Sequence, residues 1–190
     1  MKAPSSQLAV EMVRQWASDR SLRFESNALL GNGAVLSQCG GFRYLLWRHA
    51  SAVSPFIGFG MLNPSTADHE SDDPTIQRCI GRASRMRGAL LVWNLFAMRA
   101  TEPDVMKRAD DPVGEYNDAV IDIALGLTST TIAAWGTDGG HRNRQRAVLK
   151  RCGAAEARLH VLKLTKGGYP GHPLYIGGSI EPTEWAYDWE

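Results

Sequence analysis

The chain has 190 residues, of which 44% are hydrophobic and 22% are charged, and its formal net charge is +1. This composition is typical of a globular protein with one sizeable core, so we expect a single domain over residues 1–190. The small net charge excludes a strong overall attraction to nucleic acid, although a local basic patch stays possible. No apolar run approaches the roughly 20 residues of a membrane span, and the first residues lack a signal-peptide pattern. We therefore expect a cytoplasmic protein without a membrane partner.

Residues 1–50 predict a short helix followed by a β-hairpin. Ser5 or Ser6 can cap the helix. Its apolar face would consist of Leu8, Met12, Val13 and Trp16. The segments Ala34–Gln38 and Phe42–Arg48 flank Cys39-Gly40-Gly41 and are predicted to pair as antiparallel strands.

Residues 51–178 predict a core in which strands and helices alternate, followed by a tail over 179–190. The strands are expected at Phe56–Leu62, Ala89–Trp93, Thr131–Trp135 and Leu159–Leu164. Helices are expected from Asp73-Pro74, from Thr101, over Val113–Leu125 and over His141–Lys150. Alternation of this kind predicts an α/β fold, a three-layer α/β/α sandwich with a mostly parallel central sheet and the N-terminal hairpin as an antiparallel addition. Trp185, Tyr187 and Trp189 in the tail are expected to pack on this body.

Each predicted strand of the core ends in small or polar residues. In chain order these are Asn63, Pro64, Ser65 and Thr66, then Asn94, then Trp135 and Gly136, and finally Lys166. Because the carboxyl ends of parallel strands share one edge of a sheet, these residues should converge there and form a pocket. The alternative is a set of ordinary turns, since Asn, Pro, Ser and Thr are common turn residues.

Two of the polar residues near the strand ends suggest specific roles. Asn94 follows five apolar residues and is expected to be buried, where an unpaired amide would cost about 1–3 kcal/mol. It either bonds to a neighbouring loop or binds a ligand, and its paired donor and acceptor suit the edge of a nucleobase. His172 lies in a glycine-rich loop before Pro173, and it is a candidate general acid or oxyanion donor, or else an ordinary loop histidine.

Charged residues around the helix that begins at Asp73-Pro74 allow two further interpretations. Arg78, Arg82 and Arg85 lie opposite its apolar stripe, and they form either a solvated face or phosphate contacts. The acidic loop before the helix could hold Mg²⁺ through Asp68 and Asp72, or it could be solvated. Asp73 itself is best explained as the helix cap.

Five motifs carry a resemblance to a family. LNPSTAD (62–68), DDPTIQRC (72–79), NLFAMRAT (94–101), AWG (134–136) and HPLY (172–175) together resemble the bacterial and phage family called domain of unknown function 1643. The resemblance covers roughly Gly41 to Ile176 and implies no established activity.

The order of these motifs is also similar to that of the uracil-DNA glycosylase superfamily, although Leu62 directly precedes Asn63 and no aromatic residue follows Pro64. This second resemblance implies that Asn63 holds the attacking water and Asn94 binds the base. It further implies that His172 stabilises the departing base anion and that Leu174 acts as a wedge. Such chemistry needs positioned donors and a water, and no metal.

Three functions are therefore open. The first is an N-glycosidase-type hydrolase that acts on a nucleoside or nucleic acid and needs no cofactor. The second is a Mg²⁺-dependent phosphohydrolase or nuclease. The third is a non-catalytic module that binds a nucleotide or nucleic acid, with the arginines on phosphates and Asn94 on the base. The sequence leaves the oligomeric state open.

Overall fold

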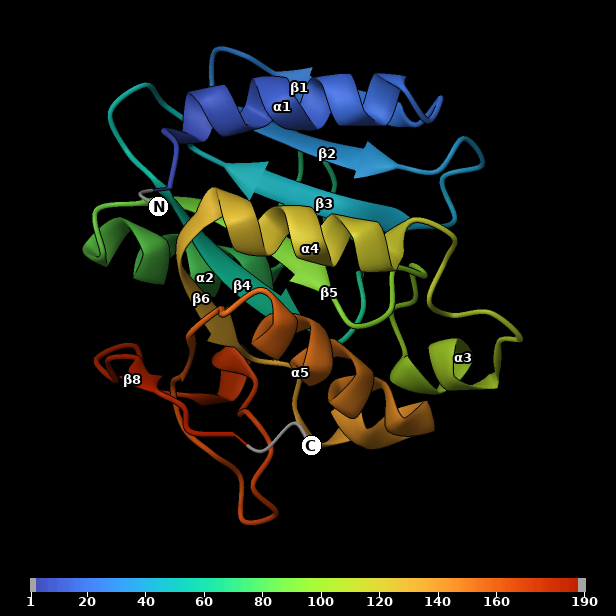
Figure 1. The fold of residues 1–190 in the computed structure, drawn as a ribbon, viewed down its shortest axis with the longest axis vertical. Coiled ribbons are helices and arrows are strands. Elements are labelled where there is room, and N and C mark those ends of the chain that lie inside the picture. The colour runs from blue at the N-terminus through green and yellow to red at the C-terminus, as the bar shows by residue number, and fades with distance from the viewer. Residues whose placement is uncertain (1–2, 188–190) are drawn as a thin grey trace.

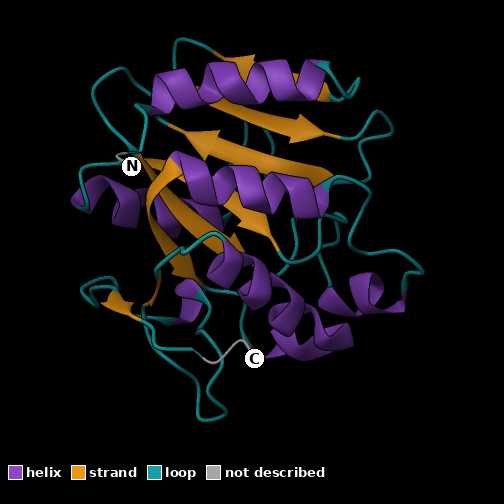
Figure 2. Ribbon diagram, viewed as in Figure 1, coloured by secondary structure: helices purple, strands orange, loops and turns teal. Residues whose placement is uncertain are grey.

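The computed structural model describes residues 3–187, and within them the chain forms an eight-stranded mixed sheet with five α-helices (Figures 1 and 2). The strands are β1 (Arg23–Asn27), β2 (Asn32–Leu36), β3 (Arg43–Arg48), β4 (Phe56–Met61), β5 (Ala89–Asn94), β6 (Thr128–Ala133), β7 (Leu159–Val161) and β8 (Thr183–Glu184). The helices are α1 (Ser6–Ser18), α2 (Pro74–Arg85), α3 (Pro103–Arg108), α4 (Asn117–Leu127) and α5 (Arg144–Ala154), with short 3₁₀ helices η1 (Thr137–Asn143) and η2 (Pro173–Tyr175). The fold is thus of the α/β class.

The sheet is mixed, and the expectation of a mostly parallel sheet was wrong. Its strand order is β1-β2-β3-β5-β4-β6-β7-β8, and only the pairs β5/β4, β4/β6 and β6/β7 are parallel among the described residues. The other four of the seven pairs are antiparallel. A central parallel group is therefore extended on one side by the meander β1–β3 and on the other by β8. Strand β1 was not predicted because its RFESN run is polar and only partly buried, and β8 was not predicted because it has just two residues, both exposed.

The first helix begins where it was predicted, and its predicted apolar face is half correct, because Val13 is buried and Trp16 packs against the core. Ser5 Oγ accepts a hydrogen bond from the Leu8 amide, which confirms the serine cap. Leu8 and Met12, however, are exposed, whereas Ala9, Val13 and Ala17 pack in the core. Small alanine side chains let the helix backbone lie close to the sheet, so the alanine stripe is buried in place of the bulkier residues.

The hairpin and the start of α2 agree with the sequence, and several later boundaries do not. The β2 and β3 strands pair antiparallel, and the Asp73 carboxylate caps α2 by accepting from the Ile76 amide at 2.8 Å. The long helix begins at Asn117 and not at residue 113, because the Asp111 carboxylate holds the chain in a turn by accepting from the amides at 113 and 114. Likewise α5 starts at Arg144, after η1, and both β6 and β7 end two or three residues early.

The core has two parts, one on each face of the sheet. Alpha-helices α1, α4 and α5 cover one face, and α2 covers the other (Figure 1). Side chains of a strand alternate between faces. In β5, Leu91 and Trp93 belong to the first part, and Leu90 and Val92 to the part under α2. By the same alternation Asn94, the last residue of β5, faces the α2 side.

The described part of the tail packs on the body, as expected. The rings of Trp185 and Trp135 lie 6.0 Å apart, and the Tyr187 hydroxyl donates to the Ala157 carbonyl at 3.1 Å. Trp189, which was expected to join them, lies outside the described residues. Among residues 3–187, no helix is both long and apolar enough to cross a membrane.

Candidate functional site

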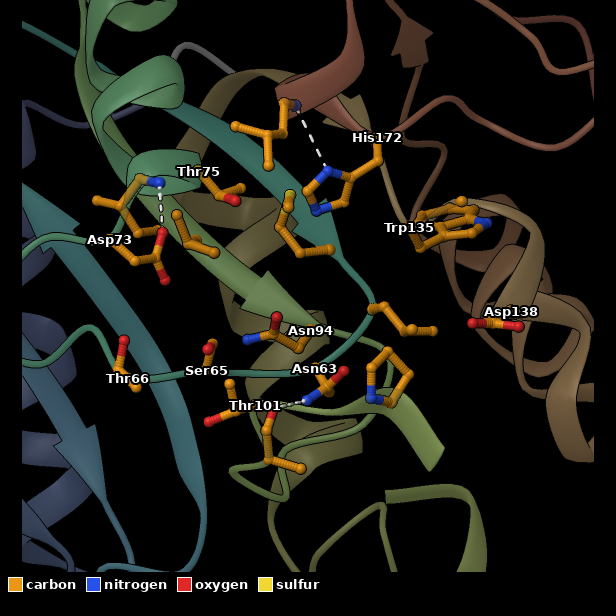
Figure 3. A pocket seen from close by; sticks show the side chains of 18 of the residues that line it. Asn63, Ser65, Thr66, Asp73, Thr75, Asn94, Thr101, Trp135, Asp138 and His172 are labelled. Atoms are coloured by element: carbon orange, nitrogen blue, oxygen red, sulfur yellow. Dashed lines mark hydrogen bonds between the residues drawn. The ribbon is translucent and has the colours of Figure 1, made fainter. Parts of the chain in front are cut away.

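A pocket of about 670 Å³ opens at the carboxyl ends of β4, β5 and β6 (Figure 3). Its walls come from the chain that follows these strands, from the first turn of α2 and from the His172 loop. Predicted site residues that line it are Asn63, Ser65, Thr66, Asn94, Trp135, Gly136, His172 and Leu174. Residues separated by more than 100 positions in the sequence thus meet at one edge of the sheet.

Parallel pairing is what brings these strand ends together. Met61 at the end of β4 pairs with Asn94 at the end of β5, and Gly60 pairs with Ala133 at the end of β6. After β6 the chain turns at Gly136, whose φ of 73° is a conformation that favours glycine. The polar residues that follow each strand therefore emerge side by side.

Asn94 is the most unusual group in the pocket. It is 1% exposed, and neither its side-chain oxygen nor its side-chain nitrogen has a hydrogen-bond partner among the described residues. Its main chain is held in place because Asn117 Nδ2 donates to the Asn94 carbonyl at 3.0 Å. The predicted bond to a neighbouring loop is absent from the described part of the chain. The amide thus keeps one free donor and one free acceptor toward the pocket (Figure 3).

Asn63 is fixed by its nitrogen. Its Nδ2 donates to the Ala100 carbonyl at 2.8 Å and to the Pro64 carbonyl at 3.0 Å. Two carbonyl acceptors determine which end of the amide is nitrogen. The Oδ1 atom makes no hydrogen bond with the described residues, so Asn63 offers the pocket an acceptor.

His172 enters the pocket from the side opposite Asn94 (Figure 3). Its Nδ1 accepts from the Leu174 amide at 3.4 Å, which places the proton of a neutral ring on Nε2. Burial lowers the pKa of His172, and the charge of Asp73 opposes this effect without cancelling it. The ring is therefore neutral near pH 7 and can donate one hydrogen bond from Nε2.

Arg43, on β3, is a pocket residue that sequence reasoning missed. It is 2% exposed, its Nη1 donates to the Ala67 carbonyl at 2.5 Å, and its Nε has no partner. Burial lowers the pKa of Arg43 to about 10, although the charge of Asp73 acts in the opposite direction. The guanidinium is still charged near pH 7. A charged residue inside the apolar run Phe42–Arg48 was the sequence feature that could have revealed it.

The remaining walls add hydroxyls and carboxylates. Further lining residues that were not among the predicted site residues include Asp73, Thr75, Thr101, Glu102, Asp138 and Tyr175. Asp138 is paired with Lys107 at 2.9 Å, and Asp73 caps α2. Tyr175 is 84% exposed at the mouth, next to Leu174. The pocket therefore has a polar floor and an aromatic residue at its opening.

Some predicted residues lie elsewhere. Pro64 is buried beside the pocket, where its carbonyl accepts from the Ala100 amide at 2.9 Å. Lys166 is exposed in a turn in which the Tyr169 amide donates to Thr165 Oγ1 at 3.1 Å, and it does not line the pocket. Trp135 lines it, but the indole is packed in the core and donates to Gln145 Oε1 at 2.5 Å.

The arginines of α2 hold the C-terminal segment. Arg82 was expected on an exposed face, and it is 3% exposed. Its guanidinium donates to the carbonyls of Ile176, Gly177 and Ile180, at 2.8–3.0 Å. Arg85 donates to the Gly178 carbonyl at 2.7 Å, and Arg78 is exposed. None of the three lines the pocket, and Arg82 and Arg85 anchor the chain that follows the His172 loop.

The acidic loop before α2 is used internally. Asp72 forms an ion pair with Arg48 at 2.7 Å, and Arg48 is fully buried. Asp68 accepts from the amides of Glu70 and Ser71. Among residues 3–187, no group of three or more histidine, cysteine, aspartate or glutamate side chains is arranged to hold a metal ion. Asp68 and Asp72 thus both have partners within the protein.

Comparison with known proteins gives one family. The model of the family described as "Protein of unknown function (DUF1643)" matches residues 43–174. No curated protein and no solved structure is significantly similar to the chain, so these comparisons do not support the likeness to the uracil-DNA glycosylase superfamily. The matched span begins at Arg43 and ends at Leu174, and it includes every residue that lines the pocket except Tyr175. The chain belongs to this family of unknown function.

Proposed function

We propose that the pocket binds a nucleobase-like ring through Asn94, and that the protein is a hydrolase of the N-glycosidase type acting on a nucleoside or nucleic acid. The observation that supports this proposal is the Asn94 amide, which is buried and unpaired at both ends. Leaving such a group unpaired costs about 1–3 kcal/mol. A ligand that satisfies both ends would recover this free energy.

The chemical form of the amide favours a nucleobase edge. An asparagine side chain presents a donor and an acceptor side by side, and it can pair with an adjacent acceptor and donor on a base. The pocket volume of about 670 Å³ lies within the range of small-molecule sites. The ring would lie between Asn94 and His172, with Leu174 and Tyr175 at the entrance.

Two further groups suit cleavage of a glycosidic bond. In this reaction a water oxygen bonds to the anomeric carbon while the bond to the base nitrogen breaks, and the base leaves with the electron pair. Asn63 Oδ1 would accept a hydrogen bond from the attacking water. The neutral His172 would donate from Nε2 to the base, which stabilises the developing negative charge. The water's proton passes to solvent once the new C–O bond has formed, and the departing base anion takes up a proton, so that the charges balance.

Binding and cleavage can be tested separately. A panel of bases, nucleosides and nucleotides is added to the wild type and to Asn94→Leu, and thermal unfolding is followed. A ligand at a hundred times its dissociation constant stabilises by about 2.7 kcal/mol. For a chain of this size the midpoint rises by about 5–10 °C. A rise that is lost in Asn94→Leu supports base binding, and no rise for any ligand at millimolar concentration contradicts it.

Cleavage is then followed by chromatography of the released base, with nucleosides and oligonucleotides as substrates and with EDTA present. Asn63→Leu and His172→Ala are expected to abolish release while still binding the base. Binding without release would favour the non-catalytic module. Release that EDTA abolishes would instead favour the metal-dependent hydrolase.

A further inference from the structure

We propose that Arg43 forms an anion subsite in the pocket, so that the natural ligand carries a phosphate group as well as a base. This inference deepens the proposed function and rests on it for the base, although the subsite itself depends on different residues. The ligand would then be a nucleotide or a nucleic-acid phosphodiester, and not a free base.

Two buried arginines on the same strand, β3, differ in their partners. Arg48 is fully buried and has a complete set of partners, namely the Asp72 carboxylate and the carbonyls of Trp47, Asp68 and Ser71. Arg43 is almost as buried, but it makes one described hydrogen bond, to the Ala67 carbonyl. Its Nε is unpaired, and it forms no ion pair within residues 3–187. The guanidinium of Arg48 therefore forms an ion pair with a carboxylate, whereas that of Arg43 forms none among the described residues.

A buried cation without a counter-charge is costly. The effective penalty for removing an ion from water is several kcal/mol, and a paired anion with good hydrogen bonds offsets it. The guanidinium fork also matches the geometry of phosphate and carboxylate oxygens. At Arg48 the paired anion is the Asp72 carboxylate of the protein itself. Arg43 instead lines the pocket, where a ligand can supply the negative charge.

Strand geometry places Arg43 on the same side as Asn94. A register shift between Val35 and Leu36 makes Arg43 the partner of Leu36 on β2. Leu36 belongs to the part of the core under α2, which is also the side that Asn94 faces. One ligand can therefore reach the amide and the guanidinium from the space between α2 and the sheet.

The neighbouring wall suits an anion in part. The hydroxyl residues Ser65, Thr66 and Thr75 line the pocket beside the N-terminus of the 12-residue helix α2, where the helix dipole favours negative charge. Asp73 lies on the same wall and partly neutralises this field, but its Oδ1 is used as the cap and it forms no described ion pair with Arg43. Arg43 thus has no ion pair among the described residues, and a ligand anion can pair with it.

The test compares matched ligands that differ only in charge. Binding of a nucleoside, its 5′-monophosphate, its 5′-carboxylate and the corresponding dinucleotide is measured by calorimetry at low and at moderate salt. In the wild type, the monophosphate or the dinucleotide should bind about 10- to 100-fold more tightly than the nucleoside, as one charge-assisted contact supplies. The tighter of the two identifies the source of the phosphate. A carboxylate that binds as tightly as either would overturn the phosphate assignment.

Three variants locate the effect. Arg43→Met removes the charge, and Arg43→Gln keeps a donor that can reach toward the Ala67 carbonyl. Arg78→Met removes one positive charge from an exposed position of α2 outside the pocket, so it controls for long-range electrostatics. The phosphate advantage should vanish in both Arg43 variants and persist in Arg78→Met, whereas the affinity for the uncharged nucleoside should change less than about threefold.

The possible failures are distinguishable. A phosphate advantage that survives in a folded Arg43 variant contradicts the subsite, and so does loss of cooperative unfolding in both Arg43 variants, which would make Arg43 a structural cation. Nucleoside binding that depends on Asn94, with no gain from phosphate, overturns this inference and leaves the proposed function intact. Phosphate binding that depends on Arg43, with no base preference, supports the anion subsite and contradicts the proposed base binding.

Discussion

Replacing Asn94 with leucine should stabilise the free protein while abolishing base binding. The two side chains have the same number of heavy atoms and branch at the same carbon, and Asn94 is 1% exposed on the α2 side of the sheet, next to the apolar residues Val92 and Met61. Leucine would remove two polar atoms that have no hydrogen-bond partner in the described structure. A residue selected for folding alone would not leave both atoms unpaired.

The size of the effect follows from the burial. A buried unpaired polar group costs about 1–3 kcal/mol, so its removal should raise the free energy of unfolding by that amount. For a chain of this length, each kcal/mol moves the melting midpoint by about 2–4 °C. Asn94→Leu should therefore melt about 2–12 °C higher than the wild type.

The assay is urea unfolding at equilibrium together with thermal melting, both without ligand, and an unchanged urea m-value shows that the two-state comparison is valid. Asn117→Leu is the matched control. Asn117 is equally buried, but its Nδ2 donates to the carbonyls of Asn94 and Leu95 at 3.0 Å. Its replacement leaves buried carbonyls with fewer partners and should lower the free energy of unfolding by about 1–3 kcal/mol. The two asparagines should thus give opposite signs.

The reasoning is refuted if Asn94→Leu lowers the free energy of unfolding by 1 kcal/mol or more, on the order of one lost hydrogen bond, at an unchanged m-value. That result would mean that the amide has a partner in the free protein. Asn94 would then be a structural residue, and the base pocket would lose its principal support.

Three more predictions follow from partners and burial. Burial lowers the pKa of His172 below its ordinary value of 6.5, so the unfolded chain binds more protons than the folded chain between the two pKa values. The free energy of unfolding should therefore fall as the pH drops below about 6.5, and His172→Gln should remove this part of the pH dependence. Asp72→Asn leaves buried Arg48 without its counter-charge and should lower the free energy of unfolding by about 1–3 kcal/mol in urea titrations, equally with and without Mg²⁺; a loss confined to Mg²⁺ would instead favour a metal site. Burial raises the pKa of Cys152 to about 12 and also raises that of Cys79. A thiol reagent should therefore modify exposed Cys39 quickly and the other two cysteines only after unfolding, and Cys39→Ser should remove the fast phase of modification.

The sequence predicted correctly those helices and strands that depend on neighbouring residues. Asp73 before Pro74 identified the start of α2, and the apolar run at Phe56–Leu62 identified β4, because caps and buried strands depend on neighbouring residues. The direction of the edge strands could not be predicted in this way. Whether β3 pairs with β5 or with another strand depends on contacts between residues about 45 positions apart, which leave no periodic pattern.

Pocket residues also divide into those that neighbouring residues reveal and those that depend on contacts between distant parts of the chain. Polar residues at strand ends indicated Asn63, Asn94 and His172, since each interrupts an apolar or glycine-rich segment. Arg43 was missed because an arginine at the start of a strand usually points to solvent, although its position inside the apolar run Phe42–Arg48 was a signal. Its burial results from the register shift opposite Val35 and Leu36, which is a property of the pairing and not of the residue. Arg82 was misjudged for a related reason, since the chain that covers it lies about 95 residues later.

Unpaired polar atoms alone do not identify a site, and this fold contains others, such as Trp93 Nε1 and His141 Nε2. Those atoms lie outside the pocket lining, so they point to no common ligand. Asn94 and Arg43 differ because they come from neighbouring strands, face the same side of the sheet and line the same pocket. One offers a donor and an acceptor in one plane, and the other offers a charged donor. The proposed nucleotide would meet both needs, with the planar polar edge of its base at Asn94 and its anionic phosphate at Arg43.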